Sequence, residues 1–177
     1  EYLQQTQEKL EQLQQIAKLL EQAQKAVAEA VVRLGRAAAV LTQLREASAK
    51  ALAQRITQHI RDLAMPNGVL QIKCGQLDKF MPLGRDELKF IFSANMGEPL
   101  NDLEKVASGG ELSRIALAVK TVLMNSGDVA TMVFDEIDTG VGGVTAQKMA
   151  EKIAAISGVG QVLCITHLPQ IAAFADN

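Results

Sequence analysis

Apolar residues repeat along the first third of the chain with the spacing of a coiled-coil helix. When heptad position a is placed at Leu3, eleven of the sixteen a and d positions from Leu3 to Arg55 are apolar. This stretch contains no proline and a single glycine, Gly35, so little in it interrupts a helix. One arm of an ordinary helical bundle is the alternative. The unbroken length favours a coiled coil.

The heptad weakens after residue 44, where the apolar spacing changes to Leu52, Ile56 and Ile60. We therefore predict a coiled-coil strand over about 1–43 that joins a globular body near 45–64. A lone helix would leave its apolar seam in water. No later helical pattern is long enough to cover that seam, so its partner must come from other sequence or from another molecule.

The pattern changes after residue 64, where Met65-Pro66-Asn67-Gly68 is expected to break the helix. Alternation at 70–74 and 88–92 predicts two strands, with the glycine- and proline-containing stretch between them as their loop. Further elements are expected in the order helix, strand, helix, strand and short helix, at about 109–125, 129–134, 144–156, 161–166 and after 169. This order predicts an α/β fold with a mostly parallel sheet and crossover helices.

Charge and cysteine content narrow the class of protein. The 18 basic and 20 acidic residues give a net charge of -2, which excludes a generally basic nucleic-acid binder but leaves room for a local basic patch. No apolar run is long enough for a transmembrane helix, and the N-terminus does not resemble a signal peptide. Cys74 and Cys164 form no metal-ligand or disulfide pattern, which fits a reducing cytosol.

The arm, residues 1–64, carries a charge of +2 and the remainder carries -4. Direct DNA binding by the arm is left open, because a charge run is usually a solvated face and no aromatic stacking platform accompanies it. The basic residues that give the arm its positive charge include Arg33, Arg36, Arg45, Lys50, Arg55 and Arg61.

A first candidate site is Ser108-Gly109-Gly110-Glu111, at the start of a predicted helix. Ser108 and Glu111 have the spacing of a capping box, which is the structural interpretation. Two glycines in a first helical turn, however, each cost up to about 1 kcal/mol relative to alanine. Two glycines are explained if the helix backbone must approach an anion such as phosphate closely. Ser108 could cap the helix and also face phosphate, so the structural and ligand-binding interpretations are compatible.

A second candidate is the acidic pair Asp135 and Glu136, directly after the strand predicted at 129–134. The carboxyl ends of parallel strands are where α/β folds bind ligands. Neighbouring residues on an extended chain point to opposite sides, which favours a division of labour. Asp135 would hold Mg²⁺, through water, while Glu136 orients or deprotonates an attacking water. The alternative is that these residues form only the solvated start of a loop. Two acids followed by a third, Asp138, make this alternative the weaker one.

The third candidate is His167, at the end of the second buried strand. A lone histidine is usually structural. If the two strands are parallel neighbours, however, His167 lies at the same sheet edge as Asp135 and Glu136, which favours a phosphate contact. His59 has no such setting and is expected on the helix surface. A hydrolase triad of Ser108, His167 and Asp135 fails because no G-x-S-x-G elbow surrounds the serine.

Together these motifs resemble the ABC-type ATPases. Ser108-Gly109-Gly110-Glu111 is similar to the signature motif, Val133-Phe134-Asp135-Glu136 to the Walker B strand, Ile137-Asp138-Thr139-Gly140 to the D-loop and Thr166-His167 to the switch histidine. They stand in the family's order. The preceding coiled coil points to the SMC-like branch. The runs at 95–99, 105–114 and 166–170 resemble its members that repair DNA double-strand breaks. The resemblance is dense over 95–177 and loose over 1–64.

The resemblance implies a fold and an activity. The fold would be a coiled-coil arm, 1–64, followed by the C-terminal half-lobe of an ATPase head, 65–177. ATP and Mg²⁺ would be sandwiched between two heads, with the signature residues Ser108, Gly109, Gly110 and Glu111 serving the partner's ATP. Glu136 and His167 would be catalytic, Asp135 would hold the metal, and Asp138 would belong to the D-loop. Arg114, one helical turn further on, is expected to pair with an acid or phosphate or to lie on the surface.

This chain departs from the family in lacking any G-x-x-x-x-G-K-[ST] phosphate loop, since Gly140-Val141-Gly142-Gly143 has no lysine. We therefore expect it to be inactive alone, with part of its apolar inner surface exposed.

The implied partners are the N-terminal half of the same protein, a second head in a homodimer, and DNA, with contacts not located and no membrane. The implied location is the cytoplasm, at the nucleoid. A structural coiled-coil module with a silent lobe is the alternative. The coiled coil argues against a transporter subunit.

Overall fold

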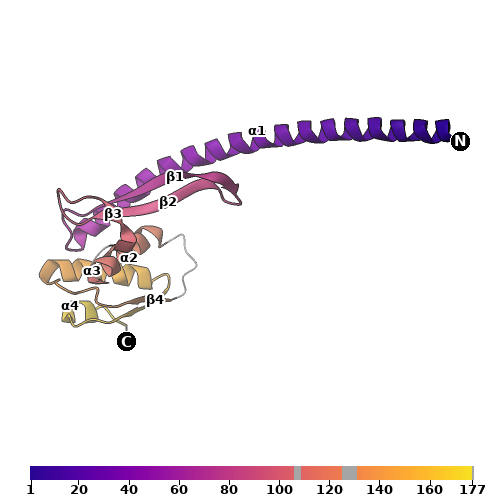
Figure 1. The fold of residues 1–177 in the computed structure, drawn as a ribbon. Coiled ribbons are helices and arrows are strands. Elements are labelled where there is room, and N and C mark those ends of the chain that lie inside the picture. The colour runs from indigo at the N-terminus through magenta and orange to yellow at the C-terminus, as the bar shows by residue number, and fades with distance from the viewer. Residues whose placement is uncertain (106–108, 125–130, 177) are drawn as a thin grey trace. The chain divides into compact units, whose positions relative to one another are not determined.

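The computed structural model describes residues 1–105, 109–124 and 131–176, except for the side chain of Glu104. It divides into two compact units, one formed by 1–44 with 79–85 and the other by the rest. A single helix, α1 (Tyr2–Asp62), begins in the first unit and ends in the second (Figure 1). It stops where the backbone of Ala64 turns to a φ of 63°, just before Met65 and Pro66, in agreement with the predicted break.

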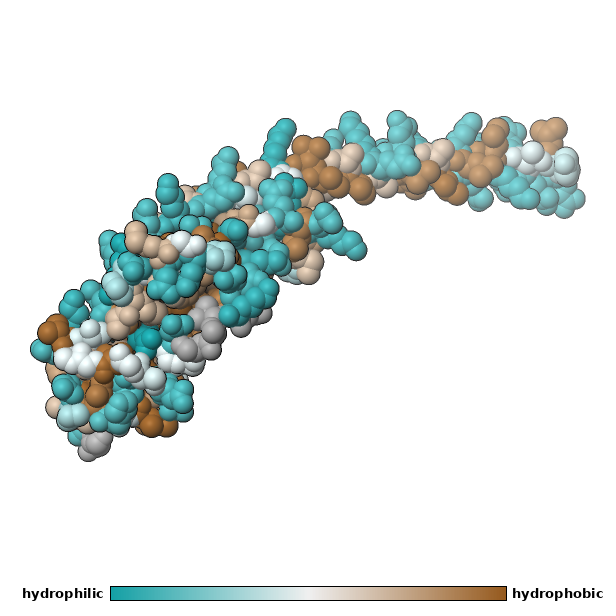
Figure 2. Space-filling view, turned by 60° about the vertical axis from the view of Figure 1, so that its left-hand side comes forward, coloured by the Kyte–Doolittle hydropathy of each residue, from teal (hydrophilic) through white to brown (hydrophobic). Residues whose placement is uncertain are grey.

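In the first unit, the apolar seam of α1 is exposed. Every residue from 1 to 34 is exposed, and among the described residues nothing covers the heptad positions there. Figure 2 shows apolar side chains interspersed with polar ones along this helix. Burial begins only at Ala38 and Thr42, in the unit that also contains residues 79–85. The described residues therefore leave the heptad seam of residues 1–34 exposed.

In the second unit, the end of α1 is part of the hydrophobic core. Ile56, Ile60 and Leu63 are completely buried in a cluster that also contains Leu70 and Phe92. The spacing of four residues between Ile56 and Ile60 keeps both on one helix face. This stretch of α1 therefore packs into the core of the second unit.

Three strands form an antiparallel layer in the order β1 (Val69–Met81), β2 (Gly84–Ser93) and β3 (Asn101–Asp102). In β2 and β3, Phe92 lies opposite Asn101. The predicted loop between the first two strands is wrong: both strands continue through it, and the turn consists of Pro82 and Leu83. Gly84, with a φ of 100°, permits this tight turn.

The remaining elements form the parallel α/β part. After the 3₁₀ helix Leu103–Lys105 come α2 (Gly109–Leu123), β4 (Thr131–Phe134), α3 (Gly143–Ser157), β5 (Gln161–Cys164) and α4 (Pro169–Ala172). β4 and β5 pair in parallel, with Phe134 opposite Cys164, as the order of elements predicted. Helix α3 lies against β5, α2 and α4 (Figure 1). Residues 125–130, which include the predicted end of the first helix and start of the first strand, lie outside the described residues.

The described residues cover the β4–β5 pair on one face only. Phe134 is buried, and Met132, Val162 and Cys164 are packed against the core. The alternate residues Val133, Leu163 and Ile165 are 64%, 52% and 61% exposed. Parallel strands are normally covered on both faces. This open apolar face agrees with the expectation that part of the inner surface is exposed.

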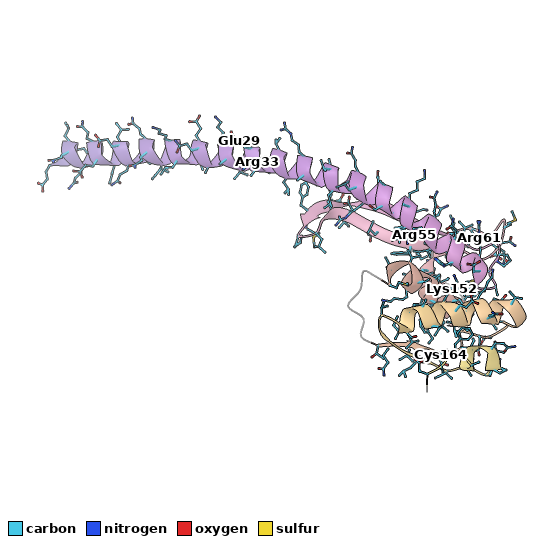
Figure 3. The ribbon with its side chains drawn as sticks, turned by 180° about the vertical axis from the view of Figure 1, so that it is seen from behind. Glu29, Arg33, Arg55, Arg61, Lys152 and Cys164 are labelled. Atoms are coloured by element: carbon cyan, nitrogen blue, oxygen red, sulfur yellow. The ribbon has the colours of Figure 1, made fainter. Side chains whose placement is uncertain are left out.

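The end of α1 is also joined to α3 by polar contacts. Lys152 Nζ lies 2.6 Å from His59 Nδ1 and 3.3 Å from Asp62 Oδ2, and Lys148 Nζ is 3.3 Å from Asp62 Oδ1. Figure 3 shows Lys152 on α3 beside the end of α1 that carries Arg61. His59 is half-buried here, so its predicted surface position is wrong. Burial and the Lys152 charge lower its pKa below 6.5, against the opposing effect of Asp62.

Cys74 and Cys164 are both free thiols in this structure. Among the helices of the described part, none combines the length and the apolar character that crossing a membrane would require.

A buried ion pair ties α1 to the start of β2, and its removal is expected to destabilise the fold. Arg45 Nη1 lies 2.8 Å from Asp86 Oδ2, and the Asp86 side chain is only 1% exposed. We expect Arg45→Ala to lower the free energy of unfolding by about 3 kcal/mol, because it removes the cation beside a buried carboxylate. Urea denaturation measures this. The matched control is Lys89→Ala, which breaks an exposed pair with Glu87 and should cost less than about 1 kcal/mol. Equal effects of the two substitutions would contradict the argument.

The half-buried His59 predicts a pH dependence of stability. Its pKa in the folded protein is below 6.5, so the unfolded chain binds the proton more readily. Stability should therefore be complete above pH 6.5 and decline as the pH falls from there towards the folded-state pKa. The free energy of unfolding, measured between pH 7 and pH 5, should decline less in His59→Gln, which keeps an acceptor for Lys152 but does not titrate. An unchanged pH profile in that variant would exclude His59 as the cause.

Candidate functional site

The candidate site is built around the segment that follows β4, residues 135–139. Ile165 N donates to Phe134 O at 2.9 Å, so pairing with the neighbouring strand continues to the very end of β4. The chain then turns at Glu136, whose φ is 55°. Thr139 N donates to Glu136 O at 3.2 Å and holds this turn. The extended backbone predicted across Asp135 and Glu136 is therefore wrong at Glu136, although both side chains are exposed.

Helix α2 begins against this segment. Ser113 Oγ donates to Asp135 O at 2.9 Å, and Arg114 Nη1 donates to Thr139 O at 3.0 Å. A Cβ placed on Gly110 would lie 3.0 Å from Glu136 O. Glycine is needed here because the helix backbone packs on the backbone of its own chain. The sequence had suggested only a ligand as the reason for this glycine.

Gly109, the first described residue of α2, has a looser environment. Among the described residues, a Cβ there would meet only Glu136 Oε2, at 3.1 Å, the far end of a flexible side chain. The structure thus brings the start of α2 close to Glu136 of the same chain. Glu111 is partly buried in the first turn of α2, and Ser108 lies outside the described residues. The predicted capping box is therefore not described.

Arg114 is buried, with 8% of its surface exposed, so the surface alternative for this residue is wrong. Burial lowers the pKa of its guanidinium, while Glu111 acts in the opposite direction. The described residues offer no hydrogen-bond partner to its Nε atom. Arg114 therefore holds α2 to the 135–139 segment through the Thr139 carbonyl.

Asp138 joins the 135–139 segment to the residues that follow β5. Its side chain is 3% exposed, and its Oδ2 atom accepts hydrogen bonds from Thr166 Oγ1 at 2.5 Å and from His167 N at 2.9 Å. His167 Nδ1 lies 3.1 Å from the same oxygen, and the imidazole is 71% exposed. Burial alone would raise the pKa of Asp138, but these hydrogen bonds and the nearby His167 lower it below 3.8. The carboxylate therefore remains ionised.

Only some of the site residues predicted from the sequence come together in the structure. β4 and β5 are parallel neighbours, so His167 lies at the sheet edge that carries Asp135 and Glu136, as expected. The contact that His167 makes there is with Asp138. Among the residues that the structure describes, no three His, Cys, Asp or Glu side chains gather to form a metal site.

Two residues of this arrangement were not found from the sequence. They are Thr166, directly before His167, and Ser113, within the run 105–114. A hydroxyl directly before a histidine at a strand end is a weak signal for Thr166. For Ser113, the signal is its position one helical turn after Gly109, on the face that carries Gly110.

Comparison with solved structures defines the fold. The chain is similar to an Smc head domain with an extended coiled coil from Pyrococcus furiosus, with a TM-score of 0.51 and 23% identity over 72% of this chain and 30% of that chain. An Smc head domain from Pyrococcus yayanosii matches with a TM-score of 0.51 and 24% identity, over 72% of this chain and 23% of that one. The fold is that of an SMC-type head lobe preceded by a long helix, which confirms the predicted fold class. No family model matches the chain.

Curated relatives identify the family. The chain is 44% identical over 155 residues to DNA repair protein RecN of Bacillus subtilis, covering 79% of this chain and 27% of that protein. It is 40% identical over 185 aligned positions to RecN of Treponema pallidum, covering 99% of this chain and 32% of that protein. Over the stretch that it spans, the chain belongs to the RecN family, and it spans about a third or less of the length of these relatives.

The close approach at Gly110 predicts a difference between the two glycines of α2. Gly110→Ala should destabilise the protein by about 1–3 kcal/mol, because its Cβ would press on the backbone carbonyl of Glu136. Gly109→Ala should change stability by less than about 1 kcal/mol, because the Glu136 side chain can move aside. Thermal unfolding of both variants measures the difference. A Gly110→Ala variant as stable as Gly109→Ala would show that α2 does not need this approach.

Proposed function

We propose that the chain is part of the ATP-binding and ATP-hydrolysing head of a RecN-type protein that acts in recombinational repair of DNA double-strand breaks. The observation that carries the proposal is the grouping at one sheet edge of Glu136 after β4 and His167 after β5, linked through Asp138, with α2 beginning beside them. Sequence similarity to proteins named RecN and the SMC-head fold support it.

In the proposed reaction, Glu136 orients and deprotonates the attacking water, and His167 contacts the transferred phosphate. Both groups are exposed, so they can reach a nucleotide. Ser108, the Gly109 and Gly110 backbone and Glu111 would act on the ATP held by a second head. The start of α2 suits this role because its free N–H groups and the helix dipole favour an anion. The chain would therefore contribute to two nucleotides.

The residues present fit Mg²⁺. Asp135 is an exposed carboxylate at the carboxyl end of a parallel strand. Mg²⁺ is usually held by one or two carboxylates together with water and substrate phosphates, so one carboxylate suffices. When bound, the ion would neutralise charge that develops on the phosphates.

The two unpaired apolar surfaces support the proposed partners. We assign residues 1–64 to a coiled-coil arm and 65–177 to the C-terminal half-lobe of the head. The N-terminal half of the protein, with the phosphate loop and the second coiled-coil strand, would cover the seam of α1 and the face formed by Val133, Leu163 and Ile165. A second head, DNA and a cytoplasmic location at the nucleoid belong to the same proposal.

The alternative is a structural module whose lobe docks without catalysis. It is favoured by one observation, the absence of a G-x-x-x-x-G-K-[ST] phosphate loop from this sequence. The two functions differ in whether supplying the missing half restores turnover.

The test is Mg-ATP turnover by this chain, alone and mixed with a separately made N-terminal half of a RecN-type protein. We expect turnover only in the mixture, and a loss of about 10²–10⁴-fold in Glu136→Gln, which removes the general base. Glu151→Gln on the exposed face of α3 is the matched control and should retain full turnover.

Absence of turnover in a properly assembled mixture would favour the docking module. Turnover by the chain alone that survives Glu136→Gln would place the site elsewhere.

A further inference from the structure

Asp138 makes an unusually complete set of contacts for a buried carboxylate. Its Oδ2 atom faces three donors, Thr166 Oγ1, His167 N and His167 Nδ1, at 2.5, 2.9 and 3.1 Å. Thr166 Oγ1 in turn accepts a hydrogen bond from Leu168 N at 3.1 Å. The carboxylate is therefore fixed by backbone and side chain together, whereas the imidazole that it contacts remains largely in solvent.

The contact between Asp138 and His167 Nδ1 determines where the ring carries its proton. An ionised carboxylate only accepts hydrogen bonds, and the lowered pKa of Asp138 keeps it ionised. An unprotonated Nδ1 at 3.1 Å would place two lone pairs against each other. Nδ1 must therefore carry hydrogen, since the partner of one ring nitrogen sets the tautomer.

We propose that Asp138 is a positioning residue that holds His167 in the Nδ1–H form, with Nε2 left as the nitrogen that faces the ligand. The assignment of that ligand as a nucleotide phosphate or its attacking water rests on the function proposed above; the tautomer does not. A neutral ring held in this way can accept a hydrogen bond at Nε2, for example from water. It can donate to phosphate only when the ring is protonated, with the Asp138 charge beside it.

The other histidine of the chain provides an internal contrast. His59 Nδ1 lies 2.6 Å from Lys152 Nζ, and a lysine ammonium has donors but no acceptor. His59 Nδ1 must therefore accept, which leaves the proton on Nε2. The chain contains only these two histidines. They are thus expected to be opposite tautomers in the same molecule.

Nitrogen-15 NMR of the histidine-labelled chain tests the proposal at a pH where both rings are neutral. We expect one Nδ1–H ring and one Nε2–H ring, with His59→Gln removing the Nε2–H signals and so assigning them. Asp138→Ala should abolish the Nδ1–H preference of His167 while the His59 signals, which report on the fold, stay in place. His167 as Nε2–H in the unsubstituted chain would overturn the proposal, and so would an unchanged Nδ1–H form in Asp138→Ala. The unsubstituted spectrum decides the matter even if the variant does not fold.

Turnover in the reconstituted mixture tests the role in the reaction. Asp138→Asn should lower kcat by about tenfold or more with a smaller change in KM for ATP, because it disturbs the group behind a catalytic histidine. Full turnover in that variant would overturn the positioning role. If the unsubstituted mixture is inactive, the proposed function fails while the tautomer result still stands.

Discussion

The candidate site depends on the packing of the 135–139 segment between the start of α2 and the residues after β5. Gly110 allows the helix backbone to reach the Glu136 carbonyl, and Ser113 and Arg114 bind carbonyls at either end of the segment. On the other side, Asp138 accepts hydrogen bonds from Thr166 and His167. A movement of any one of these three parts would therefore be transmitted to the other two. In the proposed function, this links the helix that serves one nucleotide to the residues that serve another.

The same arrangement explains why polar groups here are buried at acceptable cost. Asp138 is nearly inaccessible, yet its carboxylate is compensated by donors from a neighbouring strand end. Arg114 is compensated less completely, through one backbone carbonyl. Buried charges without full compensation are costly. Under the proposal above, this polar cluster positions His167.

Beyond the site, the fold is marked by apolar surface that the described residues leave uncovered. The seam of α1 is exposed through residue 34, and the β4–β5 pair has one open face. Both surfaces have the pattern of an element that is normally covered, a heptad seam in one case and a parallel sheet in the other. The core around Ile56, Ile60 and Leu63 is by contrast closed. The chain thus contains a complete core beside surfaces suited to further protein.

The sequence by itself determined the elements whose side chains repeat with a clear period. The long helix, α3, the β4–β5 pair and the short α4 follow from apolar spacing and from glycine and proline, which act locally. The motifs also indicated that Asp135, Glu136 and His167 lie at the same edge of the β4–β5 sheet. The two strands of the β1–β2 hairpin were predicted, but their extension over the outer half was missed, because glycine, proline and irregularly spaced apolar residues there give no alternating pattern. The left-handed turn at Glu136, the burial of Arg114 and the bond from Asp138 to the residues after β5 were decided by the tertiary structure. The burial of Arg114 and the bond from Asp138 depend on contacts between segments more than twenty residues apart, about which local periodicity carries no information. The turn at Glu136 is held locally by Thr139 N and also packs against Gly110.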